Sequence, residues 1–169
     1  VGLAKTVPDG LEPSSSAACT SIVGYHPGEN YVGRAAIEAA AMGIELADNE
    51  IALRFNTLNI EQNIMKSYAC GHITTEESRS IVERLAEHLN DDTFTLYPGV
   101  AYRHILVVKD HPELLDLTYT PPHDITDKLI EGNLPRGGEG VELLLDSMAR
   151  AHELLARDPT NEARSNQGE

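Results

Sequence analysis

Three consecutive serines, Ser14, Ser15 and Ser16, stand where a loop gives way to a run of small residues that can begin a helix. The loop side holds Pro8 and Pro13, which keep the backbone out of regular structure. A serine at such a junction is a preferred residue for capping a helix N-terminus. The same place also favours a bound phosphate or an attacking alkoxide, because backbone N–H groups and the positive helix end lie there. From these residues alone we favour the capping role, since serine runs in loops are common.

Three arginines lie where a guanidinium suits an anionic ligand. Arg34 stands at the entrance of a predicted helix, where a cation is unfavourable, so it faces either an anion or the carboxylate of a surface ion pair. Arg54 lies mid-strand between small residues of its own face, which suits a side chain projecting into a cleft, although a solvated face gives the same pattern. Arg103 shares a strand face with Ile105 and Val107. A charge beside two aliphatic residues is costly unless it meets an anion or reaches solvent, so Arg103 is the strongest basic candidate.

Two histidines and an aspartate complete the candidates. His72 shortly precedes Thr74, which forms a predicted capping box with Glu77 at the start of a helix. A phosphate there would meet both the imidazole and backbone amides, whereas a lone histidine before a helix is usually an ordinary loop residue. His123 and Asp124 follow two prolines that fix the backbone at a corner. The pair suits a substrate hydroxyl or carboxylate, or Asp124 is only a helix cap.

The elements that position these residues follow from hydrophobic periodicity and turn signals. We expect a helix within residues 31–46 that begins at Arg34 and is stopped by Gly43, and further helices at residues 74–89 and 141–156. We expect strands at residues 50–58, 64–69, 93–97, 101–108 and 117–120. The first two strands are predicted to form one hairpin and the next two another, and residues 125–140 are expected to be a long loop. Together these elements predict an α+β fold with a mixed or antiparallel sheet and helices packed on one face.

The composition excludes several kinds of partner. The 169 residues include 27 Asp or Glu and 13 Lys or Arg, a formal charge of −14. Nucleic acids and anionic membranes require a basic surface, so we expect neither as a partner, and a phosphorylated substrate would need a local cluster of cations. The sequence has no long apolar run and no signal-peptide pattern. Cys19 and Cys70 are not spaced as a metal motif, which favours a reduced chain in the cytoplasm.

Both ends of the sequence look cut. It begins at Val1 without an initiator methionine, and its polar end stops without an apolar element. We therefore expect an internal piece of a longer protein, with a frayed tail at residues 159–169.

The serine run lies inside a longer pattern. The pattern reads Val7-Pro8, Gly10-Leu11, Pro13, the three serines and then Ser21-Ile22-Val23-Gly24-Tyr25-His26-Pro27. It resembles the nucleophile segment of the archaeal-type cofactor-independent phosphoglycerate mutases, in the alkaline phosphatase superfamily. Four more segments resemble that family in the same order, namely residues 33–39, 69–77, 102–104 and 121–124. The resemblance therefore covers nearly the whole chain.

The resemblance implies a specific chemistry. Ser15 falls on the family's phosphorylated nucleophile, and Ser16 replaces the acidic residue that follows it there. In the family, two divalent metal ions (manganese, zinc or cobalt) bind and activate this serine, which takes the phosphoryl group of 3-phosphoglycerate and returns it to the 2-hydroxyl. A lid of arginines and histidines holds the glycerate, and His72 matches a histidine that contacts the substrate phosphate. The remaining candidates for this lid are Arg34, Arg54, Arg103, His123 and Asp124.

The resemblance also implies a division of the chain. Residues 1–46 would be part of the metal-binding, phosphatase-like domain and would carry the nucleophile. Residues 47–158 would be an inserted substrate-binding domain, followed by the tail. No position matches the family's Asp and His metal ligands. We therefore expect the remainder of a parent chain to supply those ligands, and we expect neither bound metal nor mutase activity in this piece alone.

Two other hypotheses stay open. One is a related phosphotransferase with another acceptor alcohol, such as a homoserine-kinase-like relative, which would share the nucleophile motif and differ in the lid. The other is a binding module without catalysis, in which Ser15 is only a helix cap. Metal-binding Asp and His residues in the downstream part of a parent chain would favour either phosphotransferase over the binding module.

Overall fold

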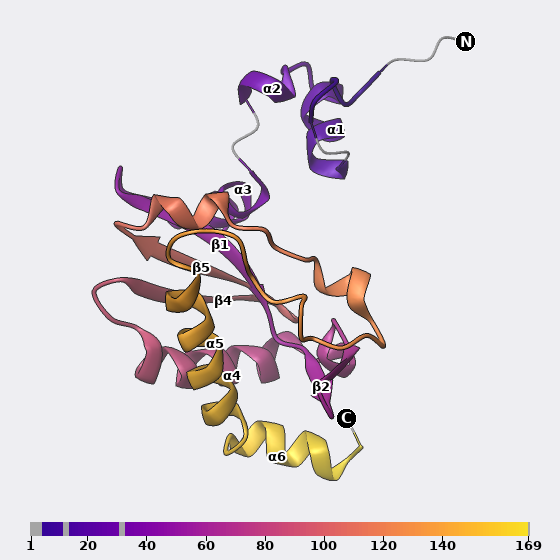
Figure 1. Ribbon diagram of the computed structural model, residues 1–169, viewed down its shortest axis with the longest axis vertical. Coiled ribbons are helices and arrows are strands. Elements are labelled where there is room, and N and C mark those ends of the chain that lie inside the picture. Colours follow the sequence, from indigo (N-terminus) through magenta and orange to yellow (C-terminus); the bar gives the residue numbers. More distant parts are fainter. Residues whose placement is uncertain (1–4, 12–13, 31–32, 169) are drawn as a thin grey trace.

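A three-stranded antiparallel sheet lies at the centre of the computed structural model (Figure 1). The structure describes residues 5–11, 14–30 and 33–168. The strand order across the sheet is β1 (Glu50–Asn56), β5 (Arg103–Lys109), β4 (Phe94–Val100). The hairpin expected within residues 93–108 is confirmed as β4 and β5, and β1 pairs with the other edge of β5.

The central strand β5 is apolar on both faces. Ile105 and Val107 point to one face, and Leu106 and Val108 point to the other. Three of these four side chains are buried and the fourth is partly buried. A strand with this pattern requires cover on both sides of the sheet, because each face would otherwise expose apolar area to water.

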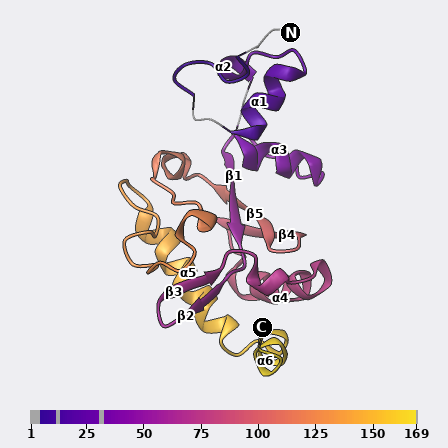
Figure 2. The same ribbon diagram turned by 90° about the vertical axis from the view of Figure 1, so that its right-hand side faces the viewer.

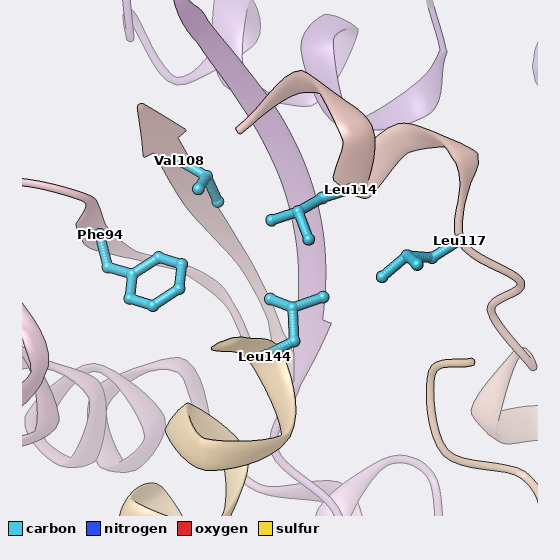
Figure 3. Close-up of a cluster of buried hydrophobic side chains, with 5 residues drawn as sticks. All are labelled: Phe94, Val108, Leu114, Leu117 and Leu144. Carbon is cyan, nitrogen blue, oxygen red and sulfur yellow. The ribbon is translucent and has the colours of Figure 1, made fainter. Parts of the chain in front are cut away.

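The two longest helices cover one face. They are α4 (Thr75–Leu89) and α5 (Val141–Leu155), which pack against each other and place Leu85 and Leu154 in one cluster with Leu96 of β4. The predicted capping box opens α4, with reciprocal hydrogen bonds between Thr74 and Glu77. Further along the same face lies the cluster shown in Figure 3, formed by Phe94, Val108, Leu114, Leu117 and Leu144. This side of the sheet is therefore the larger core of the molecule.

A shorter helix covers the opposite face. α3 (Arg34–Ala41) places the fully buried Ala39 against Ala52, Ile105 and Val107. Alanine on both sides lets the helix lie close to the sheet. The α+β class with an antiparallel sheet is thus confirmed, and α3 adds cover on the face that the longer helices leave open. α3, which lies near the end of residues 1–46, therefore packs on the sheet that residues 50–109 form.

The predicted pairing of the segment at residues 64–69 with β1 is wrong. That segment forms β3 (Ile64–Ser67), which pairs with β2 (Asn59–Glu61) in a separate two-stranded sheet. The turn between them holds Gln62 and Asn63 at φ values of 50° and 62°. Positive φ at both central residues is what a two-residue type I′ hairpin turn requires. The local turn therefore selects β2 as the partner of β3.

Residues 159–166 form a docked helix where the sequence predicted a frayed tail. α6 (Pro159–Asn166) is capped by Asp158, whose carboxylate accepts hydrogen bonds from the backbone N–H groups of Thr160 and Asn161. Arg84 of α4 donates to both oxygens of the same carboxylate, at 2.6 and 2.9 Å. Burial alone would raise the pKa of Asp158, but these hydrogen bonds bring it below its ordinary value. The polar composition of the tail hid a helix that is held by charge rather than by apolar contact.

We expect Asp158→Ala to loosen the attachment of α6 to α4. The substitution removes the helix cap and leaves the Arg84 guanidinium without its buried partner, so the free energy of unfolding should fall by about 2 kcal/mol. Urea denaturation of the two proteins at neutral pH measures the difference. Arg157→Ala is the control, because this neighbouring arginine is exposed and makes no ion pair with another described residue. Equal losses in the two variants would contradict the docking account.

The remaining elements are short. α1 (Ser15–Ile22) and α2 (Pro27–Asn30) pack against each other and lie beyond α3, away from the sheet, in Figures 1 and 2. Short 3₁₀ helices follow later in the described part of the chain, namely η1 (Cys70–His72), η2 (Pro112–Asp116) and η3 (Pro122–Ile125). The strand expected at residues 117–120 is reduced to a single bridge between Thr118 and Arg136. Among the described residues, no helix has the length and apolar character needed to cross a bilayer.

Candidate functional site

The serine run divides its roles between neighbouring residues. Ser14 is the cap of α1, because its Oγ accepts a hydrogen bond from the backbone N–H of Ala17 at 3.2 Å. Ser15 is the first helical residue, and its side chain is exposed. Its hydroxyl makes no hydrogen bond to any other residue that the structure describes. The capping role therefore falls on Ser14, and the Ser15 hydroxyl is left available at a helix N-terminus.

Arg34 and Arg54 meet at one carboxylate. Arg34 opens α3, and its Nε lies 2.7 Å from Oε1 of Glu38 one turn later. Arg54, in the middle of β1, places its Nε 2.9 Å from the other oxygen of the same carboxylate. The group carries two positive charges against one negative charge, so it keeps a net positive charge in an acidic protein. Sequence reasoning missed Glu38, although its spacing from Arg34 is that of a helical ion pair.

Arg103 lies on the same sheet face as Arg54. Arg54 is opposite Ile105 in the β1–β5 register, and Asn56 is opposite Arg103. Alternate residues of a strand share a face, so Arg54, Asn56 and Arg103 occupy adjoining polar positions on the sheet face that carries α3, where Arg54 already contacts Glu38 of that helix. Side chains at such diagonal positions start about 7 Å apart, within reach of one phosphate or carboxylate for two arginines. The prediction that Arg103 shares a face with Ile105 is confirmed by this register.

An aromatic row connects Arg103 to the predicted corner at His123. The guanidinium carbon of Arg103 lies 5.4 Å from the centre of the Tyr102 ring. Tyr102 contacts Tyr68 edge to face at 5.8 Å between centroids, and Tyr68 contacts His123 at 6.3 Å. His123 Nε2 lies 3.6 Å from Oδ1 of Asp124, and both side chains are exposed. The two tyrosines were not among the sequence candidates, because nothing local distinguishes them from surface aromatics.

His72 lies in a left-handed turn at the start of α4. Cys70, Gly71 and His72 have φ values of 49°, 61° and 61°. The left-handed region costs roughly 1 kcal/mol or more for each residue other than glycine, so the turn needs outside support. The side chain of His72 is exposed, and the Thr75 hydroxyl accepts a hydrogen bond from Ala101 N–H at 3.1 Å. That bond ties the His72 end of α4 to the β4–β5 turn next to Arg103.

His104 is a buried histidine that sequence reasoning did not single out. It is 1% exposed, packs on Phe55 at 5.0 Å between ring centres, and accepts a hydrogen bond from Gly99 N–H at Nδ1. Gly99 lies so close to the next strand that a Cβ would come within 2.1 Å of the Arg103 carbonyl oxygen. Burial lowers the pKa of His104 from 6.5 to about 4, so the imidazole is neutral at physiological pH. It supports the strand that carries Arg103 and does not itself reach the surface.

Comparison with sequence models of protein families identifies the family of this chain. A sequence model of the 2,3-bisphosphoglycerate-independent phosphoglycerate mutases matches residues 1–161. The chain belongs to this family. Mutases of this name from Methanosarcina barkeri and Methanothrix thermoacetophila are 44% and 45% identical to it over 99% of its length. The chain spans only 42% and 41% of those two relatives.

A solved structure supports the fold of this mutase-family chain. A cofactor-independent phosphoglycerate mutase from Thermoplasma acidophilum superposes with a TM-score of 0.69 at 22% identity. The superposition covers 94% of this chain and 43% of the other. The α+β arrangement of sheet and helices is therefore one that this chain shares with part of that structure.

The described residues of this mutase-family chain do not by themselves build a metal centre. Within residues 5–11, 14–30 and 33–168, no three His, Cys, Asp or Glu side chains lie close enough together to hold an ion. Ser15 has hydroxyl neighbours in Ser14 and Ser16, which are 3.3 Å apart at Oγ, and hydroxyls alone are poor ligands for divalent ions. The Ser15 position therefore does not fit a two-metal site unless other ligands are added.

The structure gathers some of the predicted site residues and separates others. Arg54 and Arg103 share one polar sheet face, and the aromatic row brings His123 and Asp124 toward it. Arg34 is connected to Arg54 because both contact Glu38. His72 lies near the start of α4, which the hydrogen bond from Ala101 N–H to the Thr75 hydroxyl joins to the β4–β5 turn. α1, the helix that begins with Ser15, lies away from the sheet (Figure 2). The chain thus gathers arginines on one sheet face and carries the Ser15 hydroxyl on a separate helix.

Proposed function

We propose that the protein containing this chain is a metal-dependent phosphoglycerate mutase that interconverts 3-phosphoglycerate and 2-phosphoglycerate through a phosphoserine at Ser15. The match of the mutase family model to residues 1–161 carries the proposal. The exposed Ser15 hydroxyl, which is not used as the helix cap, supports it. We also propose that two divalent ions (Mn, Zn or Co), held mainly by residues beyond this chain, activate that hydroxyl.

The proposed transfer balances as two displacements at phosphorus. Ser15 Oγ forms a bond to the phosphorus as the bond to the 3-oxygen of the glycerate breaks, and the proton of the serine ends on the 3-hydroxyl. The 2-hydroxyl oxygen then attacks the phosphorus of the phosphoserine and loses its proton, and the serine oxygen gains a proton in exchange as its bond to phosphorus breaks. Between the two steps the glycerate must turn without escaping. Holding it is the part that we assign to the sheet domain.

Arg54 and Arg103 are proposed to hold the anionic groups of the substrate. They lie on one polar sheet face, in a chain with a formal charge of −14, so a phosphorylated acid would be repelled elsewhere and attracted there. Their forked guanidinium groups suit carboxylate and phosphate bidentately. Arg34, His72, His123 and Asp124 complete the proposed substrate lid.

We also propose a division of labour between two parts of the chain. α1 and α2 would belong to the phosphatase-like domain at residues 1–46, and residues 47–158 would form the substrate-binding domain, with α3 bridging the two. Closure of one part on the other would bring Ser15 to the arginines. The remainder of the parent chain is the proposed partner, and the cytoplasm the proposed compartment.

Arg103→Ala in the full-length protein is expected to weaken 3-phosphoglycerate binding by about 2 kcal/mol, or roughly 30-fold, because a charge-assisted bond is lost. Isothermal titration with the Ser15→Ala background, which cannot turn over, gives the dissociation constant directly. Arg79→Ala is the matched control, since Arg79 is an exposed arginine of α4 on the other side of the sheet. Equal affinities of the Arg103 and Arg79 variants would contradict the proposed role.

The reaction itself is tested with the full-length protein, 3-phosphoglycerate and manganese. Formation of 2-phosphoglycerate, lost on chelation and restored by metal, is the expected result. Phosphate transfer to homoserine or another alcohol instead would replace the mutase proposal with the related phosphotransferase. The 169-residue chain alone is expected to show no turnover.

A further inference from the structure

We propose that Arg164 is a positioning residue, which holds the left-handed turn at residues 70–72 in the shape that presents His72 to the substrate. The inference rests on the proposed role of His72. It assigns a function to α6, whose sequence gave no sign of one. Arg164 lies on the helix that replaces the predicted frayed tail.

The contacts of Arg164 reach the turn directly. The residue is only 5% exposed, although it is an arginine on a polar helix. Its Nη2 donates to the carbonyl oxygen of Cys70 at 2.9 Å, across 94 residues of sequence. Its Nη1 donates to Oε2 of Glu77 at 3.1 Å, and that carboxylate also caps α4. One guanidinium therefore connects the turn to the first turn of the following helix.

The turn requires such a connection. Cys70 and His72 adopt positive φ without being glycine, and Gly71 between them does the same. On one side the Ser67 hydroxyl accepts hydrogen bonds from Ala69 and Gly71 N–H, at 3.3 and 3.1 Å. Arg164 is the matching anchor on the other side. With either anchor removed, the backbone is free to relax toward the right-handed region and to turn the His72 side chain elsewhere.

Arginine suits this place for geometric reasons. Its planar fork donates to a carbonyl and a carboxylate at once, which the single point charge of lysine does in poorer geometry. Glu77 compensates the buried charge. The pKa of Glu77 is lowered mainly by the hydrogen bonds from the Thr74 N–H and hydroxyl, and then by Arg164, so the Glu77 carboxyl group is ionised at neutral pH.

The chain offers a matched control. Arg84 ties the same helix α6 to α4 through Asp158, but it contacts neither the turn nor Glu77. Removing either arginine loosens α6. Only the loss of Arg164 removes a hydrogen bond from the turn at residues 70–72. Arg164→Met and Arg84→Met therefore separate positioning of the turn from docking of the helix.

Hydrogen exchange of the full-length protein tests the positioning step without reference to turnover. In Arg164→Met, the amides of His72 and Ile73, which close the turn onto Ala69 and Cys70, should exchange at least about tenfold faster. In Arg84→Met they should stay within about twofold of the parent, while the amides of α6 speed up. Arg164→Lys, which keeps the charge and most of the packing, should fall between the two and covers the case in which the methionine variant does not fold. Unchanged exchange at residues 72–73 in both Arg164 variants, or equal acceleration in Arg84→Met, would overturn the proposal.

Steady-state kinetics test the link to substrate. Arg164→Met should raise the KM for 3-phosphoglycerate about tenfold with kcat within about threefold, and it should have no further effect on KM in a His72→Ala background. Additive effects of the two substitutions, or a KM unaffected by His72→Ala, would overturn the link. Absence of mutase activity in the parent protein would instead refute the proposed function. The exchange result would then still decide whether Arg164 holds the turn.

Discussion

Replacing Ser15 by alanine in the full-length protein is expected to lower mutase turnover by at least about 10⁴-fold, as loss of a covalent nucleophile does. The protein should otherwise be intact. The Ser15 side chain is exposed, and the cap of α1 is made by Ser14. The variant should therefore keep its melting temperature and its affinity for 3-phosphoglycerate while losing the reaction.

The neighbouring serine supplies the matched control. Ser14→Ala removes the oxygen that accepts the hydrogen bond from Ala17 N–H, which should cost about 1 kcal/mol of stability while most of the activity remains. The two alanine variants are thus predicted to show opposite losses, activity in one and stability in the other. A Ser15→Ala protein that still turns over, or an inactive but stable Ser14→Ala protein, would show that the nucleophile has been misassigned.

The second large effect concerns His104 and pH. Its pKa is lowered from 6.5 to about 4 in the folded protein by burial, so the unfolded chain binds a proton before the folded one does. Folding is then opposed as the pH falls below the unfolded pKa, and the loss is complete once the folded pKa has been passed. We expect the contribution of this histidine to stability to drop by about 2 kcal/mol by pH 5 and by about 3 kcal/mol by pH 4.

The measurement compares the parent with His104→Asn. Asparagine offers an oxygen to Gly99 N–H near the place of Nδ1 and does not titrate. Urea denaturation of both proteins is measured between about pH 7.5 and pH 4. The carboxylates that the two proteins share contribute equally to both unfolding free energies, so their effect cancels in the difference. The difference in unfolding free energy should change by about 3 kcal/mol in favour of the variant as the pH falls. A difference that stays constant over this range would mean that His104 titrates normally in the folded protein.

Local signals in the sequence were sufficient for much of the fold. The capping box of Thr74 and Glu77 fixed the start of α4, and alternation placed Arg103 on the face of Ile105. Strand pairing was harder, because the register of β1 with β5 joins residues far apart in the chain. The sequence favours the nearest apolar segment, at residues 64–69, as the partner of β1, because nothing local encodes the pairing of β1 with β5.

The parts that could not be predicted depend on contacts across long separations. α6 is held by Arg84 and Glu77, which lie 74 and 87 residues before their partners Asp158 and Arg164. No periodic pattern within a polar tail records such pairs. The same holds for the aromatic row from Tyr68 to Tyr102 and for the burial of His104. The resemblance supplied Ser15 and the lid residues, and the structure supplied the side chains that orient them.

The central claim is that one serine carries the phosphoryl group during the reaction. Intact-mass and peptide mass spectrometry of the full-length protein, quenched during turnover of 3-phosphoglycerate, tests it most directly. We predict the added mass of one phosphoryl group on the peptide containing Ser15, and its absence in Ser15→Ala. A phosphoryl group on another residue, or active turnover with no phosphorylated enzyme at any time point, would contradict the account.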